Sequence, residues 1–226
     1  MRRRQALLAL PLLAAAPARA AALLEPVLRV PPPAVALTLD LCPGGFDEAL
    51  FRALVEAGIR ATCFLAGDWL RRNPAGLALL LQHRDLFAFA NHGEHHLLAA
   101  PGHASLFGQR AVADAAALRA EVVNGAAMVE AATGTRPRWY RGATGRYSPQ
   151  AMAQVEAMGC AVAGYSLNAD AGASLPAAAV AARVQAARPG DVMVAHGNQP
   201  RRPAGRGLAL GVQALRRQGV AFTWLA

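Results

Sequence analysis

The chain has 226 residues, of which 54% are hydrophobic, and a formal net charge of +9. This length and composition allow a folded domain with a large core and exclude an intrinsically disordered protein. All basic residues are arginines, and beyond residue 20 they are scattered or paired, as at 201–202 and 216–217. Nucleic-acid binding is not expected, because it requires a clustered basic stripe.

The first twenty residues predict a signal peptide. Arg2, Arg3 and Arg4 precede an apolar run from Ala6 to Ala16, and residues 18–20 (A-R-A) resemble a cleavage site. This run is too short to cross a bilayer, and no later segment reaches roughly eighteen apolar residues, so no integral membrane segment is expected. We therefore expect an exported protein, periplasmic or secreted, through either the general secretory or the twin-arginine route.

A proline run at 31–33 separates a loosely packed lead-in, residues 21–33, from the main domain, residues 34–226. Short apolar runs predict strands at 34–41, 59–66, 86–90, 138–141, 160–167, 191–196 and 220–225. Helices are predicted at 46–57, 69–82 (broken near 73–76), 114–132, 149–158, 176–187 and 207–218, with a loop at 97–110. The alternation predicts one α/β domain with about seven parallel strands.

Five ionisable residues fall at the carboxyl ends of the predicted strands. Asp40 closes the first strand, His92 follows the third, Arg141 closes the fourth, Asp170 follows the fifth and His196 closes the sixth. Parallel barrels carry their chemistry at this edge. The pattern therefore favours a closed or nearly closed (β/α) barrel over an open doubly wound sheet, with the five side chains on one rim.

Two histidines in the segment A-N-H-G-E-H-H-L suggest a metal site. His92 and His96 lie four residues apart, which places both imidazoles on one side of a helical turn. Such a pair suits two ligands of one metal ion. Of the three cysteines, Cys63 and Cys160 lie in strand-like runs and are interpreted as buried thiols. Cys42, near Asp40, is interpreted as part of the pocket wall, with a soft metal ligand as the alternative.

Five segments carry a resemblance in chain order: T-L-D-L-C-P, H-G-E-H-H, Y-R-G-A-T-G, S-L-N-A-D and V-A-H. They resemble the ordered motifs of the polysaccharide deacetylase family, the NodB homology domain of carbohydrate esterase family 4. The resemblance covers about residues 34–226, the predicted catalytic domain. It implies a distorted (β/α) barrel and a divalent metal ion, usually Zn²⁺, that activates water to remove acetyl groups from N-acetylated sugars.

The resemblance also implies roles for individual residues. Asp40 resembles the general base, and His92 and His96 resemble the metal ligands. Arg141 resembles the arginine that holds the base in place. Asp170 resembles the carboxylate that polarises the acidic histidine, here His196.

The chain departs from the family at Leu41, where the family usually has a metal-binding aspartate. Two imidazoles alone make a weak site, because catalytic zinc normally has three protein ligands. We expect the missing ligand to be Asp40 itself or Asp47 from the adjoining loop, with Glu94 as a further alternative.

These observations predict an exported metal-dependent hydrolase that removes acetyl groups from an N-acetylated glycan. Peptidoglycan, chitin-like oligomers and exopolysaccharide all fit as substrates. The alternatives are a catalytically silent glycan-binding barrel and a metal-independent hydrolase of cyclic amides on the same scaffold. Trp69, Trp139 and Tyr140 are interpreted as core aromatics rather than as a sugar platform.

Overall fold

The computed structural model describes residues 22–225. The predicted signal peptide, residues 1–20, therefore lies outside the described residues. Between residues 22 and 225, no helix combines the length and the apolar character that a membrane span requires.

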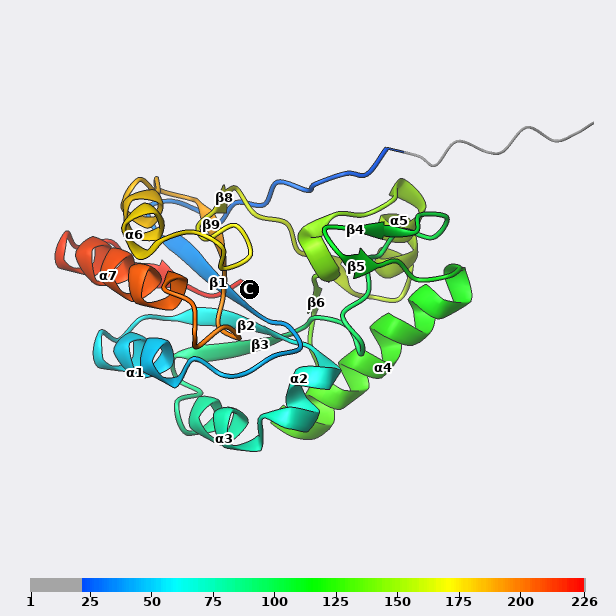
Figure 1. Ribbon diagram of the computed structural model, residues 1–226, viewed down its shortest axis with the longest axis horizontal. Helices are drawn as coiled ribbons and strands as arrows, with labels where there is room; N and C mark the ends of the chain where they lie inside the picture. Colours follow the sequence, from blue (N-terminus) through cyan, green and yellow to red (C-terminus); the bar gives the residue numbers. More distant parts are fainter. Residues whose placement is uncertain (1–21, 226) are drawn as a thin grey trace, which may run out of the picture.

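A curled parallel sheet lies at the centre of the molecule (Figure 1). Its strands are β1 Val35–Leu41, β2 Ala61–Leu65, β3 Phe87–Asn91, β6 Trp139–Tyr140, β7 Ala161–Val162, β8 Leu167–Asn168, β9 Val192–His196 and β10 Phe222–Thr223. Their order is β7-β6-β3-β2-β1-β9-β8, and β10 pairs with the start of β1. The predicted distorted (β/α) barrel is confirmed, in a half-open form whose edges are β7 and β8.

Helices surround the outside of this sheet (Figure 1). They are α1 Glu48–Glu56, α2 Gly67–Arg72, α3 Pro74–Gln82, α4 Ala115–Thr133, α5 Pro149–Ala157, α6 Ala177–Gln185 and α7 Ala204–Arg217. The predicted break in the second helical segment is confirmed at Asn73, which ends α2 and precedes α3. Pro74 suits the first position of α3, because an amide hydrogen there has no partner within the helix.

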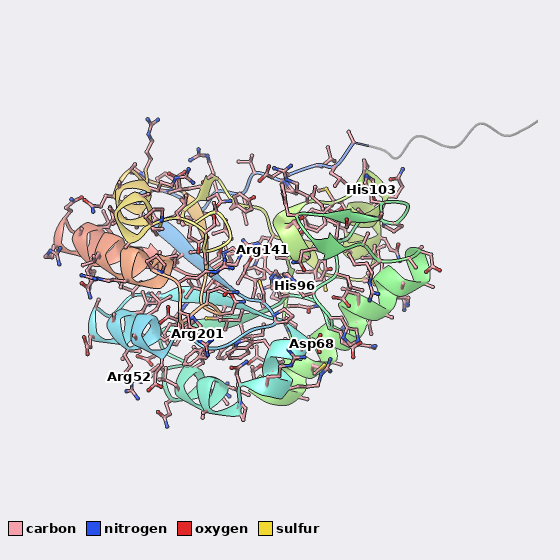
Figure 2. The ribbon with its side chains drawn as sticks, in the orientation of Figure 1. Arg52, Asp68, His96, His103, Arg141 and Arg201 are labelled. Carbon is pink, nitrogen blue, oxygen red and sulfur yellow. The ribbon has the colours of Figure 1, made fainter. Side chains whose placement is uncertain are left out.

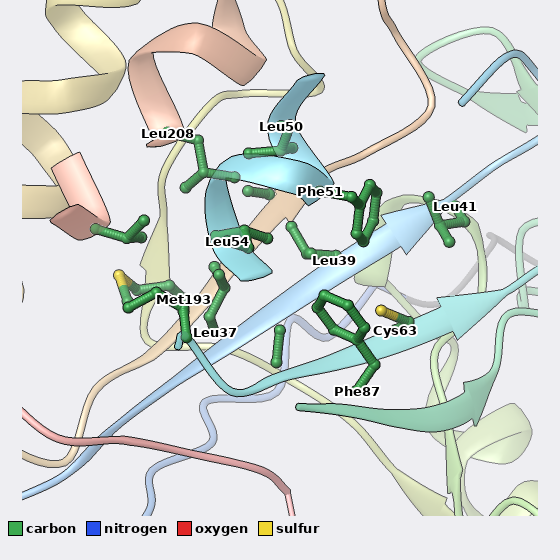
Figure 3. Close-up of a cluster of buried hydrophobic side chains, with 14 of the residues drawn as sticks. Leu37, Leu39, Leu41, Leu50, Phe51, Leu54, Cys63, Phe87, Met193 and Leu208 are labelled. Atoms are coloured by element: carbon green, nitrogen blue, oxygen red, sulfur yellow. The ribbon is translucent and has the colours of Figure 1, made fainter. Parts of the chain in front are cut away.

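The main hydrophobic core lies between the sheet and the outer helices. Leu37, Leu39 and Leu41 of β1 belong to it, together with Phe51 of α1 (Figure 3). Side chains alternate between the two faces of a strand, so the residues between these leucines, including Asp40, face the other side of the sheet. The leucines pack β1 against α1 on the outer side of the sheet. The alternate positions of β1, on the inner side, include polar groups.

The predicted fifth strand is divided. Residues 160–167 form two short strands, β7 and β8, at opposite edges of the sheet, and residues 163–166 cross between them. The glycine and tyrosine at 164 and 165 leave the strand alignment, and Tyr165 N donates instead to Pro26 O at 3.2 Å. This division leaves the barrel open.

The lead-in contacts the domain more closely than expected. We call residues 22–30 the strap. Leu24 and Tyr147 exchange two backbone hydrogen bonds, Val30 N donates to Gly190 O, and Arg29 Nη1 contacts Asp191 Oδ1 at 2.9 Å. The strap therefore crosses the molecule from the side of α5 to the side of β9 (Figure 1).

The predicted loop at 97–110 contains a small hairpin. Strands β4 Ser105–Leu106 and β5 Gln109–Arg110 pair in antiparallel register around the two-residue loop Phe107-Gly108. The hairpin matters for the site, because Phe107 and Gln109 both line the pocket described next.

Candidate active site

A pocket of about 800 Å³ lies at the carboxyl ends of the strands. Its lining includes Asp40, Cys42, His96, Arg141 and His196. Figure 2 shows His96 and Arg141 near the middle of the molecule, whereas Arg52 lies at its periphery. The structure thus brings residues from β1, β9 and the segments after β3 and β6 to one cavity.

Asp40 and Arg141 form a buried ion pair. Arg141 Nη1 donates to Asp40 Oδ1 at 2.7 Å and to Thr38 Oγ1 at 2.9 Å, and its Nη2 donates to Gly164 O at 3.0 Å. Burial alone would raise the pKa of Asp40, but the charges of Arg141, His92 and His196, together with the hydrogen bond from Arg141, outweigh it and lower the pKa to about 2. Asp40 is therefore ionised at neutral pH and held in one orientation.

His196 and Asp170 form a second pair. The carboxylate of Asp170 accepts two hydrogen bonds from His196. Oδ2 accepts from the backbone N at 2.7 Å, and Oδ1 accepts from the ring Nδ1 at 2.9 Å. Burial would lower the pKa of His196, but the Asp170 carboxylate overcomes it and raises the pKa well above the ordinary value. Because β1 and β9 are in register with Asp40 opposite His196, the two pairs are neighbours.

Cys42, His92 and His96 form a potential metal-binding group. One ligand atom from each residue lies within 4.8 Å of the other two. Cys42 Sγ and His92 Nε2 are 3.4 Å apart. Burial would raise the pKa of Cys42, but the neighbouring histidines lower it well below the ordinary thiol value. The group thus favours a thiolate between two imidazoles.

The imidazoles are held in an orientation that suits metal binding. His92 Nδ1 donates to Arg141 O at 2.6 Å, and His96 Nδ1 donates to Gln109 Oε1 at 3.0 Å. Each Nε2 therefore remains for a metal ion, as in proteins whose metal-binding histidines are fixed through the other ring nitrogen. Tetrahedral bonds of about 2.0–2.3 Å place ligand atoms about 3.3–3.8 Å apart, so the spacing of Cys42 and His92 fits zinc.

The two histidines do not converge through a helix, and that part of the prediction is wrong. They lie in a turn after β3, with positive φ of 80° at Gly93 and 57° at His96. The carboxylate of Glu121 on α4 accepts from His95 N and Leu97 N, on either side of His96. A contact distant in sequence therefore shapes this turn.

The structure does not bring Asp47 or Glu94 to this group, although both were expected as candidate ligands. Asp47 accepts from Leu50 N at 3.1 Å and caps α1, so its carboxylate serves the helix instead. Glu94 accepts from Asn124 Nδ2 at 2.8 Å. Leu41 is fully buried in the outer core. Asp40 does approach the group, with Oδ2 3.7 Å from His92 Nε2, but its other oxygen binds Arg141.

Sequence reasoning underrated or missed three residues of the site. The sequence favours Cys42 as pocket wall, although strand alternation places residues 40 and 42 on the same side and so beside the base. Glu121 lies in the helix predicted at 114–132, and no local signal indicates its contacts with the histidine turn. Gln109 lies in a segment predicted as loop, and no local signal indicates its contact with His96.

Comparisons with known proteins agree with this geometry. The sequence profile of the family described as polysaccharide deacetylase matches residues 28–163. No curated protein sequence matches the chain significantly.

Solved structures with the same fold include a family 4 pseudoenzyme from Bacillus anthracis (TM-score 0.69, 21% identity, 93% of this chain and 68% of that one). A family 4 carbohydrate esterase from Streptomyces lividans, bound to acetate, has a TM-score of 0.68 at 22% identity and covers 87% and 95%. The peptidoglycan deacetylase PdaC from Bacillus subtilis has a TM-score of 0.66 at 20% identity and covers 85% and 87%. Since the profile matches more than half of its length, the chain belongs to the polysaccharide deacetylase family.

Proposed function

We propose that this protein is a metal-dependent hydrolase that removes acetyl groups from N-acetylated sugars of a polysaccharide. One observation carries the proposal. The Cys42–His92–His96 group, the Asp40–Arg141 pair and the His196–Asp170 pair meet at one pocket. A metal group, a base and an acid in one cavity are the parts that hydrolysis of an amide requires.

Cys42, His92 and His96 would hold the metal ion, and the donor set of one thiolate and two imidazoles suits Zn²⁺. When bound there, the ion would supply Lewis acidity that polarises the acetyl carbonyl and makes water a stronger acid. In this proposal Asp40 is the base rather than a ligand, because one of its oxygens is committed to Arg141.

Asp40 and His196 would move the protons. Asp40 Oδ2 takes a proton from the water that adds to the acetyl carbon. His196 Nδ1 is bound to Asp170, so Nε2 is the atom that donates a proton to the departing nitrogen as the C–N bond breaks. Acetate and a free amine result. The raised pKa of His196 keeps this proton available at neutral pH.

The pocket lining also offers polar side chains to a substrate. Thr144, Asn198 and Gln199 all line the pocket. A few polar side chains in a pocket lining can hydrogen-bond the hydroxyl and acetamido groups of an N-acetylated sugar, which supports a sugar amide as substrate.

Acetate release from N-acetylglucosamine oligomers and from peptidoglycan tests the proposal, with zinc-loaded protein. The isosteric variant Asp40→Asn is expected to lose about 10²–10⁴-fold in rate while keeping its zinc. His83→Ala is the matched control, because His83 does not line the pocket. Glycan binding without acetate release from any of these substrates would instead favour a silent glycan-binding barrel. Two observations support this alternative: Leu41 stands where the family usually has a metal-binding aspartate, and one structure with the same fold is a pseudoenzyme.

We also propose that the protein is exported. The arginine-rich start and apolar run of residues 1–20 support this. Cleavage after Ala20 leaves the strap on the mature chain. The N-terminal residue of protein recovered from the periplasm or the medium tests both points, and an uncleaved cytoplasmic product would contradict them.

A further inference from the structure

Four side chains from separate segments meet at one part of the pocket lining, and none of them belongs to the metal group or to the two ion pairs. They are Glu25 of the strap, Phe107 of the hairpin, and Arg146 and Tyr165 from the segments after β6 and β7. Glu25 accepts from Tyr165 OH through Oε1 and from Arg146 Nη2 at 2.8 Å through Oε2. The guanidinium of Arg146 lies 5.5 Å from the centre of the Phe107 ring.

Phe107 has a backbone conformation that is unfavourable for a bulky side chain. The hairpin loop has positive φ at both of its residues, 49° at Phe107 and 79° at Gly108. Two-residue loops of this kind prefer asparagine, aspartate or glycine, and a bulky residue with positive φ is an outlier. The residue is also 74% exposed. Since neither backbone nor burial explains a phenylalanine here, its position on the pocket lining indicates a role in binding.

Glu25 is held in place by the strap. Leu24 pairs with Tyr147, and Pro26 O accepts from Tyr165 N, so the backbone on both sides of Glu25 is fixed. This close approach requires Gly164, because a Cβ there would lie 1.9 Å from Pro26 O. The carboxylate is therefore positioned before any ligand arrives, and its charge is balanced by Arg146.

We propose that Phe107, Glu25 and Arg146 form a subsite for a second, uncharged sugar of the chain that is deacetylated. The exposed ring would contact the apolar face of a pyranose, and the carboxylate and guanidinium would bind its hydroxyls. The preferred ligand is then an N-acetylhexosamine oligomer rather than a monosaccharide. This inference rests on the proposed function for the substrate class, but the binding that it describes does not require catalysis.

Binding of the N-acetylglucosamine tetramer and monomer to the full protein, measured by calorimetry, tests the subsite. Phe107→Asn is the informative variant, because asparagine suits the turn and is expected to keep or raise the melting temperature. It is also expected to weaken tetramer binding by about fivefold or more, the scale of one aromatic contact. Phe107→Trp should bind the tetramer as the wild type does, and Glu25→Gln should weaken its binding.

Val27→Ala is the matched control, because Val27 is 73% exposed on the same strap and does not line the pocket. Tetramer binding no tighter than monomer binding would overturn the proposal, as would a Phe107→Asn variant that binds the tetramer like the wild type. If the protein binds the tetramer more tightly than the monomer but releases no acetate, the proposed function is contradicted and the subsite is supported.

Discussion

Replacing Cys42 by serine tests the proposed metal group most directly. Serine keeps the size of the side chain but replaces a thiolate by a hydroxyl, which is a poor ligand at neutral pH. Cys42 is only partly buried and belongs to none of the hydrophobic core clusters formed by residues 22–225, so the fold should tolerate the change. We therefore expect Cys42→Ser to affect metal affinity rather than stability of the metal-free protein.

The expected loss can be derived from the site. Structural zinc sites with four protein ligands bind with about 10–16 kcal/mol, so one ligand contributes ~2.5–4 kcal/mol and its loss weakens binding about 10²–10³-fold. Among the described residues, Asp40 is the expected candidate that approaches the group, with Oδ2 3.7 Å from His92 Nε2, but its Oδ1 is held by Arg141. Asp47 and Glu94 have other partners. A carboxylate oxygen in place of the thiolate would change the ligand type, so a loss of affinity and a changed ligand signature should both appear.

Two measurements on the purified protein check this expectation. Competition with a chelator at pH 7 gives the zinc affinity, and cobalt substitution reports the ligand type, since a thiolate ligand adds a charge-transfer absorption in the near ultraviolet. The band should be present in the wild type and absent in Cys42→Ser. Cys160→Ser is the matched control, because that thiol lies outside the group. A Cys42→Ser variant with zinc affinity within about threefold of the wild type and an unchanged cobalt spectrum would refute the reasoning.

Three further predictions concern the charged groups. Arg141→Ala should reduce the free energy of unfolding in urea by about 3–5 kcal/mol, because it leaves Asp40 buried without its partner; a loss below about 1 kcal/mol would contradict this. Asp170→Asn should lower the pKa of His196, and since the protonated form donates, the alkaline limb of kcat should move to lower pH; an unmoved limb argues against His196 as the acid. Burial opposes ionisation of Asp191, but hydrogen bonds from Arg188 N and Ser166 and the charge of Arg29 lower its pKa. The stabilising effect of Asp191 should therefore be complete above its pKa in the unfolded chain, about 3.9, and disappear as the pH falls through its lower pKa in the folded protein. The difference in free energy of unfolding between wild type and Asp191→Asn should then shrink below about pH 4.

The strand-end positions of the polar residues were predictable from the sequence. Each strand shows as an apolar run, and parallel strands end at a common edge, so Asp40, Arg141 and His196 could be assigned to one rim without any long-range information. The boundaries of β1 and β9 agree with the prediction to within one residue. The apolar run is most continuous in these central strands because both of their faces are buried.

The shape of the histidine turn was not predictable, because its determinants are distant in sequence. Glu121 and Gln109 fix the turn and the ring of His96, and neither residue is marked by a local pattern. The division of residues 160–167 depends in the same way on the strap, which binds Tyr165 only in the folded protein. By contrast, the role of Asp47 carried a readable signal, because aspartate is a preferred N-cap residue directly before an amphipathic helix such as α1.

The departure at Leu41 is best explained as a shift of the ligand by one residue. Leu41 packs in the outer core, where a Cβ added at Gly197 would lie 2.9 Å from its Cδ2. Because successive side chains of a strand alternate, the next residue on the side of Asp40 is Cys42. A thiolate there reaches His92 at 3.4 Å without displacing Asp40 from Arg141. Both imidazoles are held through Nδ1, as metal-binding histidines are, and Nε2 of His92 faces the thiol of Cys42. The arrangement therefore supports the proposed metal site with one thiolate over a silent barrel.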